Sequence, residues 1–137
     1  MNQCVFCDIA KKRVEAEIVY ETNSVLAFLD IKPINPGHTL IISKEHLVNL
    51  FDAPEDVLKD IIIAAKKISP AIMAAVKAQG INLGMNNGFA AGQRIMHCHL
   101  HLIPRFVGDK LKHWPNKSMS KSEREKIQKD ILRLLKL

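Results

Sequence analysis

The sequence predicts an α+β domain with a five-stranded antiparallel sheet, one long helix and a C-terminal helix. Three observations support this prediction: five short apolar runs bounded by turn residues, one long stretch with apolar residues at helical spacing, and a second such stretch near the end. A chain of 137 residues can bury one core. We therefore expect a single domain over 1–137, with its core in about 4–105 and an extension with a helix over 106–137.

The first three strands are expected before residue 45. Residues 17–21 and 25–29 predict two strands on either side of the turn signal Thr22-Asn23-Ser24. Residues 39–43 predict a third strand, which the chain enters from a loop with two prolines and a glycine at 33–37. Because proline neither continues a helix nor donates in a ladder, this loop should make a rigid approach.

The long helix should begin near Pro54, which two acidic residues follow, as suits a helix start. Its apolar residues recur at helical spacing up to Pro70, where we expect a kink or a break, and the pattern then continues to residue 78. Gly80 is expected to cap its C-terminal end. The final helix is expected over about 120–135, with a serine as its N-cap.

Two further strands complete the predicted sheet. Residues 81–85 predict the fourth strand and residues 95–103 the fifth, which Pro104 should end. A loop at 86–92 joins them. Five short strands with one long crossing helix are typical of an antiparallel α+β architecture.

The composition excludes a membrane protein, because no run of about 18 apolar residues occurs. The N-terminus lacks the basic segment and apolar stretch of a secretory signal, so we expect a cytoplasmic protein. In that reducing compartment the three cysteines should not form disulfides. The net charge of +6 arises entirely after residue 104. Such a basic segment could attract nucleic acid or an anionic substrate, but a solvated helix face is the favoured interpretation, and nucleic acid is not an expected partner.

Three histidines occupy one face of the fifth predicted strand. Side chains alternate along a strand, so His97, His99 and His101 should share a face, while Cys98 and the leucines after it face the core. One metal ion held by all three would be strained, because Cα atoms four residues apart on a strand are about 13 Å apart. A nucleophile with neighbours that orient it is the easier arrangement.

A neutral imidazole is a competent nucleophile toward phosphorus and carries protons near pH 7. Phosphoryl transfer also needs donors around the phosphate oxygens. The preceding loop, residues 86–94, offers amide side chains, glycines that let backbone N–H groups approach, and one arginine. We therefore expect an enzyme that cleaves a phosphate bond, with His99 as the attacking group.

The segment 92–105 resembles the signature of the histidine triad (HIT) family, in which histidines alternate with apolar residues. The segments 25–31 and 36–42 extend the resemblance, which covers roughly residues 4–105. Residues 112–115 resemble the C-terminal segment of Hint-like members, which lies near the partner subunit's site. Small HIT enzymes are generally homodimers that join their sheets, and an uncovered sheet edge is consistent with a homodimer here.

The resemblance implies a role for each of four histidines. His99 would form a covalent nucleotidyl-histidine intermediate, and the backbone carbonyl of His97 would fix the tautomer of the His99 ring. His101 would contact the α-phosphate and help to protonate the leaving group, so that both His99 and His101 also contact the nucleotide. His38 falls on the fourth histidine of the family, which supports the triad through a hydrogen bond.

The resemblance also implies a nucleotide-binding set. Asp30 falls on the acidic position that holds the ribose hydroxyls, and Ile31 on a wall of the base pocket. Asn86 falls on the amide position that binds the phosphate or ribose, and Gln93 on the glutamine just before the triad strand. Arg94 departs from the pattern, because Hint-like members usually have a small hydroxyl residue there; it would point outward or bind a second phosphate.

The pair Cys4 and Cys7 has the C-x2-C spacing of one edge of a tetrahedral zinc site. His46 and His97 could supply the other two ligands, an arrangement found in bacterial HIT proteins with this N-terminal pair and in galactose-1-phosphate uridylyltransferase. Four protein ligands leave no open position, so one structural zinc per chain is expected, with no organic cofactor. Reduced cysteines without metal, or a redox pair, are the alternatives.

The sequence leaves several functions open. The leading prediction is a nucleotide hydrolase or nucleotidyl transferase that acts at the α-phosphate of purine nucleoside phosphoramidates or acyl-nucleotides. A diadenosine polyphosphate hydrolase of the Fhit-like branch is the alternative, although that branch has glutamine at the position of Asn86. A purine nucleotide-binding module without turnover and a mono-zinc hydrolase with His99 and His101 as ligands are further alternatives.

Overall fold

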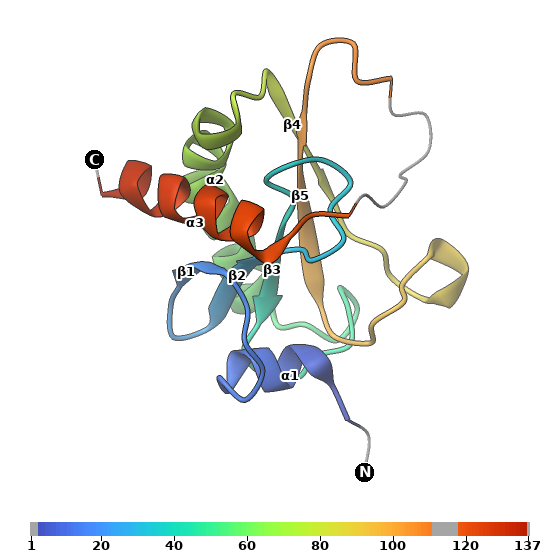
Figure 1. Cartoon of the computed structure of the whole chain (residues 1–137). Helices are drawn as coiled ribbons and strands as arrows, with labels where there is room; N and C mark the ends of the chain where they lie inside the picture. The colour runs from blue at the N-terminus through green and yellow to red at the C-terminus, as the bar shows by residue number, and fades with distance from the viewer. Residues whose placement is uncertain (1–2, 111–117, 137) are drawn as a thin grey trace.

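The computed structural model describes residues 3–110 and 118–136. Its elements, in chain order, are α1 (Val5–Ala10), β1 (Ile18–Glu21), β2 (Val25–Leu29), β3 (Thr39–Ser43), α2 (Glu55–Val76), β4 (Gly80–Gly84), the short 3-10 helix η1 (Phe89–Ala91), β5 (His99–Arg105) and α3 (Lys121–Leu135) (Figure 1). The predicted α+β class, with a long helix and a C-terminal helix, is confirmed.

The five strands form one antiparallel sheet in the order β1-β2-β3-β5-β4. Helix α2 packs against the central strands on one face, and α3 packs on α2 and β1 (Figure 1). Helix α1 packs on the other face, where Phe6 and Ile9 meet apolar residues of β2 and β3. The two faces follow the strand alternation: Ala27 lies in the α2 core, whereas Leu26 and Phe28 lie under α1.

Helix α1 was not expected from the sequence. It has only six residues, too few for a periodic apolar pattern to identify it. Cys4 is its N-cap, and the sulfur of this residue accepts from the backbone N–H of Cys7 at 3.4 Å. The apolar residues Phe6 and Ile9 lie three positions apart and are both buried, so packing holds this short helix in place.

Helix α2 continues through Pro70 without a break. Pro70 is exposed, so water can reach the carbonyl that its missing N–H would otherwise bond. The hydroxyl of Ser69 donates to the carbonyl of Ala65 at 2.6 Å in the same turn. The expected cap at Gly80 is wrong: the helix ends at Val76, Lys77 takes the left-handed conformation, and the glycine begins β4.

Strand β5 begins at His99, four residues later than expected, and includes Pro104. The N–H of Cys98 donates to the carbonyl of Leu47 at 2.6 Å, which ties the preceding segment to a loop. Pairing with β3 stops at Leu102, and proline is tolerated where a strand has lost a partner on one side. His97 therefore precedes the strand.

The C-terminal helix α3 begins at a capping box, in which Ser120 and Glu123 each accept from the backbone of the other. Ile131 is fully buried against the core, and Arg124 pairs with Glu17 just before β1. Residues 112–115, whose likeness to Hint-like enzymes the sequence suggested, lie outside the described residues. Within the described ranges, no helix has both the length and the apolar character needed to cross a membrane.

Candidate functional site

The three triad histidines face the side of the sheet that α1 covers. The rings of His99 and His101 have centroids 4.9 Å apart, and the ring of Phe6 meets those of His97 and His99 edge-on at 5.8 and 5.1 Å. Cys98 lies on the opposite face within the core, where burial raises the pKa of its thiol to about 11. The thiol stays protonated at neutral pH and is therefore a poor nucleophile.

His99 has a defined tautomer. Its Nδ1 lies 2.7 Å from the backbone carbonyl oxygen of His97. A carbonyl only accepts, so Nδ1 carries the hydrogen and Nε2 of the neutral ring keeps its lone pair. Burial lowers the pKa of His99, which favours this neutral form near pH 7. The ring therefore offers a nucleophilic nitrogen whose direction is set by a backbone hydrogen bond.

His38 and His101 form a second defined pair. The N–H of Ile34 donates to Nδ1 of His38 at 3.0 Å, so the neutral His38 ring carries its hydrogen on Nε2. That Nε2–H donates to Nδ1 of His101, also at 3.0 Å. The neutral His101 ring must then carry its own hydrogen on Nε2. One backbone N–H thus determines the tautomers of two histidines and makes His101 a hydrogen-bond donor at Nε2.

The pKa values of this pair lie well below the ordinary histidine range. Burial and the neighbouring His101 lower the pKa of His38 to about 3, and burial with the neighbouring His99 lowers the pKa of His101 to about 4. Both rings are neutral at physiological pH in the nucleotide-free protein.

These pKa shifts predict how stability depends on pH. The unfolded histidines bind protons below about pH 6.5, while the folded pair resists protonation down to pKa values of about 4 and about 3. The contribution is fully present above pH 6.5 and is lost as the pH falls through the folded pKa values. We expect Tm, measured by circular dichroism, to fall more steeply between pH 6.5 and 4 in the wild type than in His38→Asn. Parallel profiles would contradict this.

Asp30, His38 and His101 also form a cluster whose ligand atoms lie within 4.8 Å of one another. The Oδ2 atom of Asp30 lies 3.8 Å from Nε2 of His38, and burial raises the pKa of this carboxyl. The hydrogen on Nε2 of His38 faces the carboxylate and His101, so that nitrogen has no lone pair to offer a metal. The hydrogen on Nε2 of His101 likewise disfavours a catalytic metal held there together with His99.

The predicted ribose and base positions lie at the end of β2. The backbone N–H of Asp30 donates to the carbonyl of His38 at 2.9 Å, and its Oδ1 accepts from the N–H of Lys32 at 2.8 Å. The neighbouring side chain of Ile31 is 61% exposed. Asp30 is thus held next to the histidine cluster, and Ile31 is an apolar side chain open to a ligand.

The loop between β4 and β5 contains the predicted amide and cation. Gly84 pairs with His101, which places the loop residue Asn86 just beyond the end of this ladder. The Nδ2 atom of Asn86 donates to the carbonyl of Gly92 at 3.4 Å. Arg94 is exposed, which fits the expectation that it points outward.

Gln93 lies inside the protein, with 1% of its surface exposed. Its Oε1 accepts from the N–H of Gly88 at 2.9 Å, and its Nε2 donates to the carbonyls of Val48 and Ile95 at 2.6 and 3.1 Å. The amide is thus engaged at both its oxygen and its nitrogen by groups of the protein itself. We interpret Gln93 as a residue that shapes the loop, rather than one that binds the nucleotide directly as the resemblance implied.

This geometry predicts a stability effect for Gln93. The substitution Gln93→Leu removes a buried amide and leaves the carbonyl of Val48 and the N–H of Gly88 without this partner, which should cost about 1–3 kcal/mol in the free energy of unfolding. Urea denaturation measures the loss. The adjacent Arg94→Leu is the matched control, because an exposed substitution should change stability by less than about 0.5 kcal/mol. Equal costs at the two positions would be inconsistent with this role.

Sequence reasoning missed the polar residues that support this loop. The N–H of Leu50 donates to Oδ1 of Asn87 at 2.8 Å, and Nδ2 of Asn49 donates to Oε1 of Gln93 at 3.2 Å. The carboxylate of Asp52 accepts from the backbone N–H groups of Val48 and Asn49. Their only signal in the sequence is a group of Asn and Asp residues, which is equally typical of any turn.

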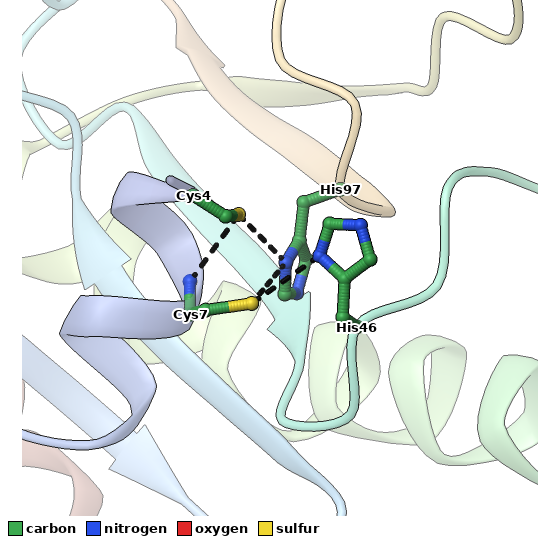
Figure 2. Close-up of side chains that lie close together, drawn as sticks. All are labelled: Cys4, Cys7, His46 and His97. Atoms are coloured by element: carbon green, nitrogen blue, oxygen red, sulfur yellow. Dashed lines mark hydrogen bonds between the residues drawn. The ribbon is translucent and has the colours of Figure 1, made fainter. Parts of the chain in front are cut away.

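A second cluster joins three distant segments of the chain. Cys4 and Cys7 come from the start of α1, His46 from the loop after β3, and His97 from just before β5, as Figure 2 shows. Their ligand atoms all lie within 4.8 Å of one another. Nδ1 of His97 lies 3.3 and 3.5 Å from the sulfurs of Cys4 and Cys7, and Nδ1 of His46 lies 3.2 Å from that of Cys7.

The cluster fits a zinc ion on its own chemistry. The Nε2 atom of His97 lies 2.6 Å from the carbonyl of Ser43, so it carries the hydrogen and leaves the lone pair of Nδ1 toward the thiols. Two sulfur and two nitrogen ligands are a set that zinc prefers in closed, four-coordinate sites. A redox pair would need only Cys4 and Cys7, and it does not explain why two imidazole nitrogens point at the sulfurs.

Fold and site together define a class of protein: an α+β domain in which three histidines, in β5 and just before it, lie on one face of an antiparallel sheet, with hydrogen bonds fixing the ring tautomers of His99 and His101. Residues 11–108 match the family model described as the HIT domain. The chain belongs to the HIT (histidine triad) family, as its motif indicated.

Solved and curated relatives agree with this assignment. A hypothetical histidine triad nucleotide-binding protein from Sulfolobus tokodaii superposes with a TM-score of 0.89 at 39% identity, covering 97% of this chain and 92% of that one. A zinc-bound histidine triad family protein from Mycobacterium smegmatis gives 0.85 at 34% identity, with 96% and 95% covered. An uncharacterized HIT-like protein from Saccharolobus solfataricus is 40% identical over 97% of this chain and 98% of its own length.

Proposed function

We propose that this protein is a nucleotide hydrolase or nucleotidyl transferase that acts at the α-phosphate of purine nucleoside phosphoramidates or acyl-nucleotides. The observation that carries the proposal is the 2.7 Å contact between Nδ1 of His99 and the carbonyl of His97, which leaves Nε2 free to attack phosphorus. The Sulfolobus tokodaii relative, described as nucleotide-binding, supports a nucleotide as the ligand. Asp30 and Ile31 would hold its ribose and base.

The proposed reaction has two displacements. Nε2 of His99 forms a bond to the α-phosphorus as the bond to the leaving nitrogen or oxygen breaks. The Nε2–H of His101 donates a hydrogen bond to the leaving atom, which takes a proton from solvent as it departs. Water then attacks the nucleotidyl-His99, gives its proton to solvent, and releases the nucleoside monophosphate with His99 neutral again.

The cluster of Cys4, Cys7, His46 and His97 would hold one structural zinc per chain. When bound, zinc would cross-link α1 to the segment that precedes β5, without an open position for chemistry. The zinc-bound Mycobacterium smegmatis relative supports this assignment. His97 would then act twice, through its ring toward the metal and through its carbonyl toward His99.

A homodimer is part of the proposal. Within the described ranges, β4 pairs only with β5, and its other edge has no partner strand. Strand edges of this kind promote association unless they are covered. A second copy of the chain joined at this edge would continue the sheet.

A substrate screen tests the proposed function against its alternatives. Adenosine and guanosine phosphoramidates, acyl-adenylates and diadenosine polyphosphates would be compared by kcat/KM, and AMP binding would be measured by calorimetry. We expect the highest kcat/KM on phosphoramidates or acyl-nucleotides. Preference for diadenosine polyphosphates would favour the Fhit-like alternative. AMP binding without turnover of any substrate would favour a binding module.

A further inference from the structure

A tight turn brings His38 to the triad. Residues 34–38, here called the His38 turn, form the second half of the link between β2 and β3. Gly37 has a φ of +86°, and a Cβ at this position would meet Val76 at 3.0 Å and Pro104 at 3.1 Å. The turn is therefore packed tightly between α2 and β5, with little room for its backbone to shift.

Asn35 attaches this turn to β5. Its side chain is buried, and Nδ2 donates to the carbonyl of Pro104 at 2.8 Å and to Oδ2 of Asp109 at 3.2 Å. The backbone carbonyl of Asn35 accepts from the backbone N–H of His38 at 3.1 Å. Arg105 in turn donates two hydrogen bonds to the carboxylate of Asp109, from Nε at 2.9 Å and from Nη2 at 2.7 Å. The amide of Asn35 thus bonds both to β5 and to the segment that follows it.

The His38 turn meets β5 at a second point, the 3.0 Å contact between Nε2 of His38 and Nδ1 of His101. His101 and Pro104 are three residues apart on the same strand. The two contacts together determine where the His38 ring lies along β5. We propose that Asn35 is a positioning residue for the proposed reaction: by anchoring the His38 turn, it holds His101 with its Nε2–H directed at the leaving atom.

This proposal rests on the proposed function for its kinetic consequence. Asn35 acts on His101 through His38, whose N–H donates to the backbone carbonyl of Asn35 and whose Nε2 meets Nδ1 of His101. The hydrogen bond from Nε2–H of His101 matters most when the leaving group is strongly basic, because such a group departs poorly unless the charge that develops on it is stabilised. Misplacing a catalytic group by about 1 Å can cost up to about 100-fold in rate.

The test compares Asn35→Ala with Asn82→Ala. Asn82 is a matched control, because its Oδ1 accepts from Nη1 of Arg105 at 2.7 Å and so belongs to the same network without contacting the His38 turn. For Asn35→Ala we expect kcat to fall about tenfold or more on an adenosine phosphoramidate of an alkylamine, and less than about twofold on that of a nitroaniline. AMP affinity should change less than about twofold. Asn82→Ala should match the wild type on both substrates.

A spectroscopic readout is independent of turnover. Nitrogen-15 NMR of the imidazoles, in the nucleotide-free protein, distinguishes the two neutral tautomers of His101. We expect hydrogen on Nε2 in the wild type and in Asn82→Ala, and a mixture in Asn35→Ala. Equal rate losses on the two leaving groups, or an unchanged His101 tautomer in Asn35→Ala, would overturn the proposal.

The proposed function and the role of Asn35 can fail separately. If the wild type turns over neither substrate, the proposed function fails and the NMR comparison alone decides the role of Asn35. If Asn35→Ala does not fold, Asn35→Ser replaces it in both measurements, since serine keeps a donor but cannot reach as far as the amide. The same outcomes then support or overturn the proposal.

Discussion

The substitution His99→Ala is expected to lower kcat/KM for an adenosine phosphoramidate by about 10⁴-fold or more, which is the scale for loss of a covalent nucleophile. The ring it removes is the one whose Nε2 is left free by the bond from Nδ1 to the His97 carbonyl. A buried thiol with a pKa of about 11 at Cys98 cannot replace it. No other side chain in the triad is aligned in this way, because His101 carries its hydrogen on Nε2.

The measurement is steady-state turnover combined with AMP binding and Tm. AMP affinity should stay within about tenfold of the wild type, since only one contact is lost, and the protein should remain folded. His101→Ala is the matched comparison and should lose about 10²–10³-fold, the usual range for removing one hydrogen-bond donor that stabilises developing charge. Turnover by His99→Ala within about tenfold of the wild type would contradict the assignment of the nucleophile.

The second large effect is expected at the N-terminal cluster. Replacing Cys4 and Cys7 together by alanine should abolish zinc binding and lower Tm by about 10 °C or more, because zinc binding energy contributes directly to the stability of the fold. The four ligands join α1, the loop after β3 and the segment before β5, so their loss releases three parts of the chain at once.

Elemental analysis and thermal melts would test this prediction. The wild type should contain one zinc per chain, and the chelated wild type should melt like the double variant. Cys98→Ala is the control for removal of a cysteine: it should keep the metal and lose only the smaller cost of a core truncation. A metal-free wild type with full stability would show that the cluster is only a set of reduced side chains.

Much of the fold could be predicted, because its strands are short apolar runs between strong turn signals. The errors have local causes. Helix α1 is too short for periodicity, and the chain beyond α2 uses Lys77 rather than Gly80 to leave the helix. Strand β5 starts late because the backbone of Cys98 bonds to Leu47 rather than to a strand, a long-range contact that the sequence does not specify.

The site was predictable where residue type alone carries the chemistry. Three alternating histidines and a C-x2-C pair are rarely needed for packing alone. In the structure the triad rings lie close to one another, and the cysteine pair lies close to two histidines. Supporting residues were not predictable. Gln93 and Asn35 are amides of a common kind, and only their burial and their bonds to distant backbone groups distinguish them from other amides on the surface.

The most direct test of the central claim is to trap the nucleotidyl intermediate. Wild-type protein would be mixed with excess adenosine phosphoramidate, quenched within milliseconds in alkaline denaturant, digested and analysed by mass spectrometry. We predict an adenylyl group on the peptide with residues 97–101, located on His99 by fragmentation and absent from His99→Ala. A wild type that turns over substrate without any labelled histidine, or with the label on another residue, would contradict the account.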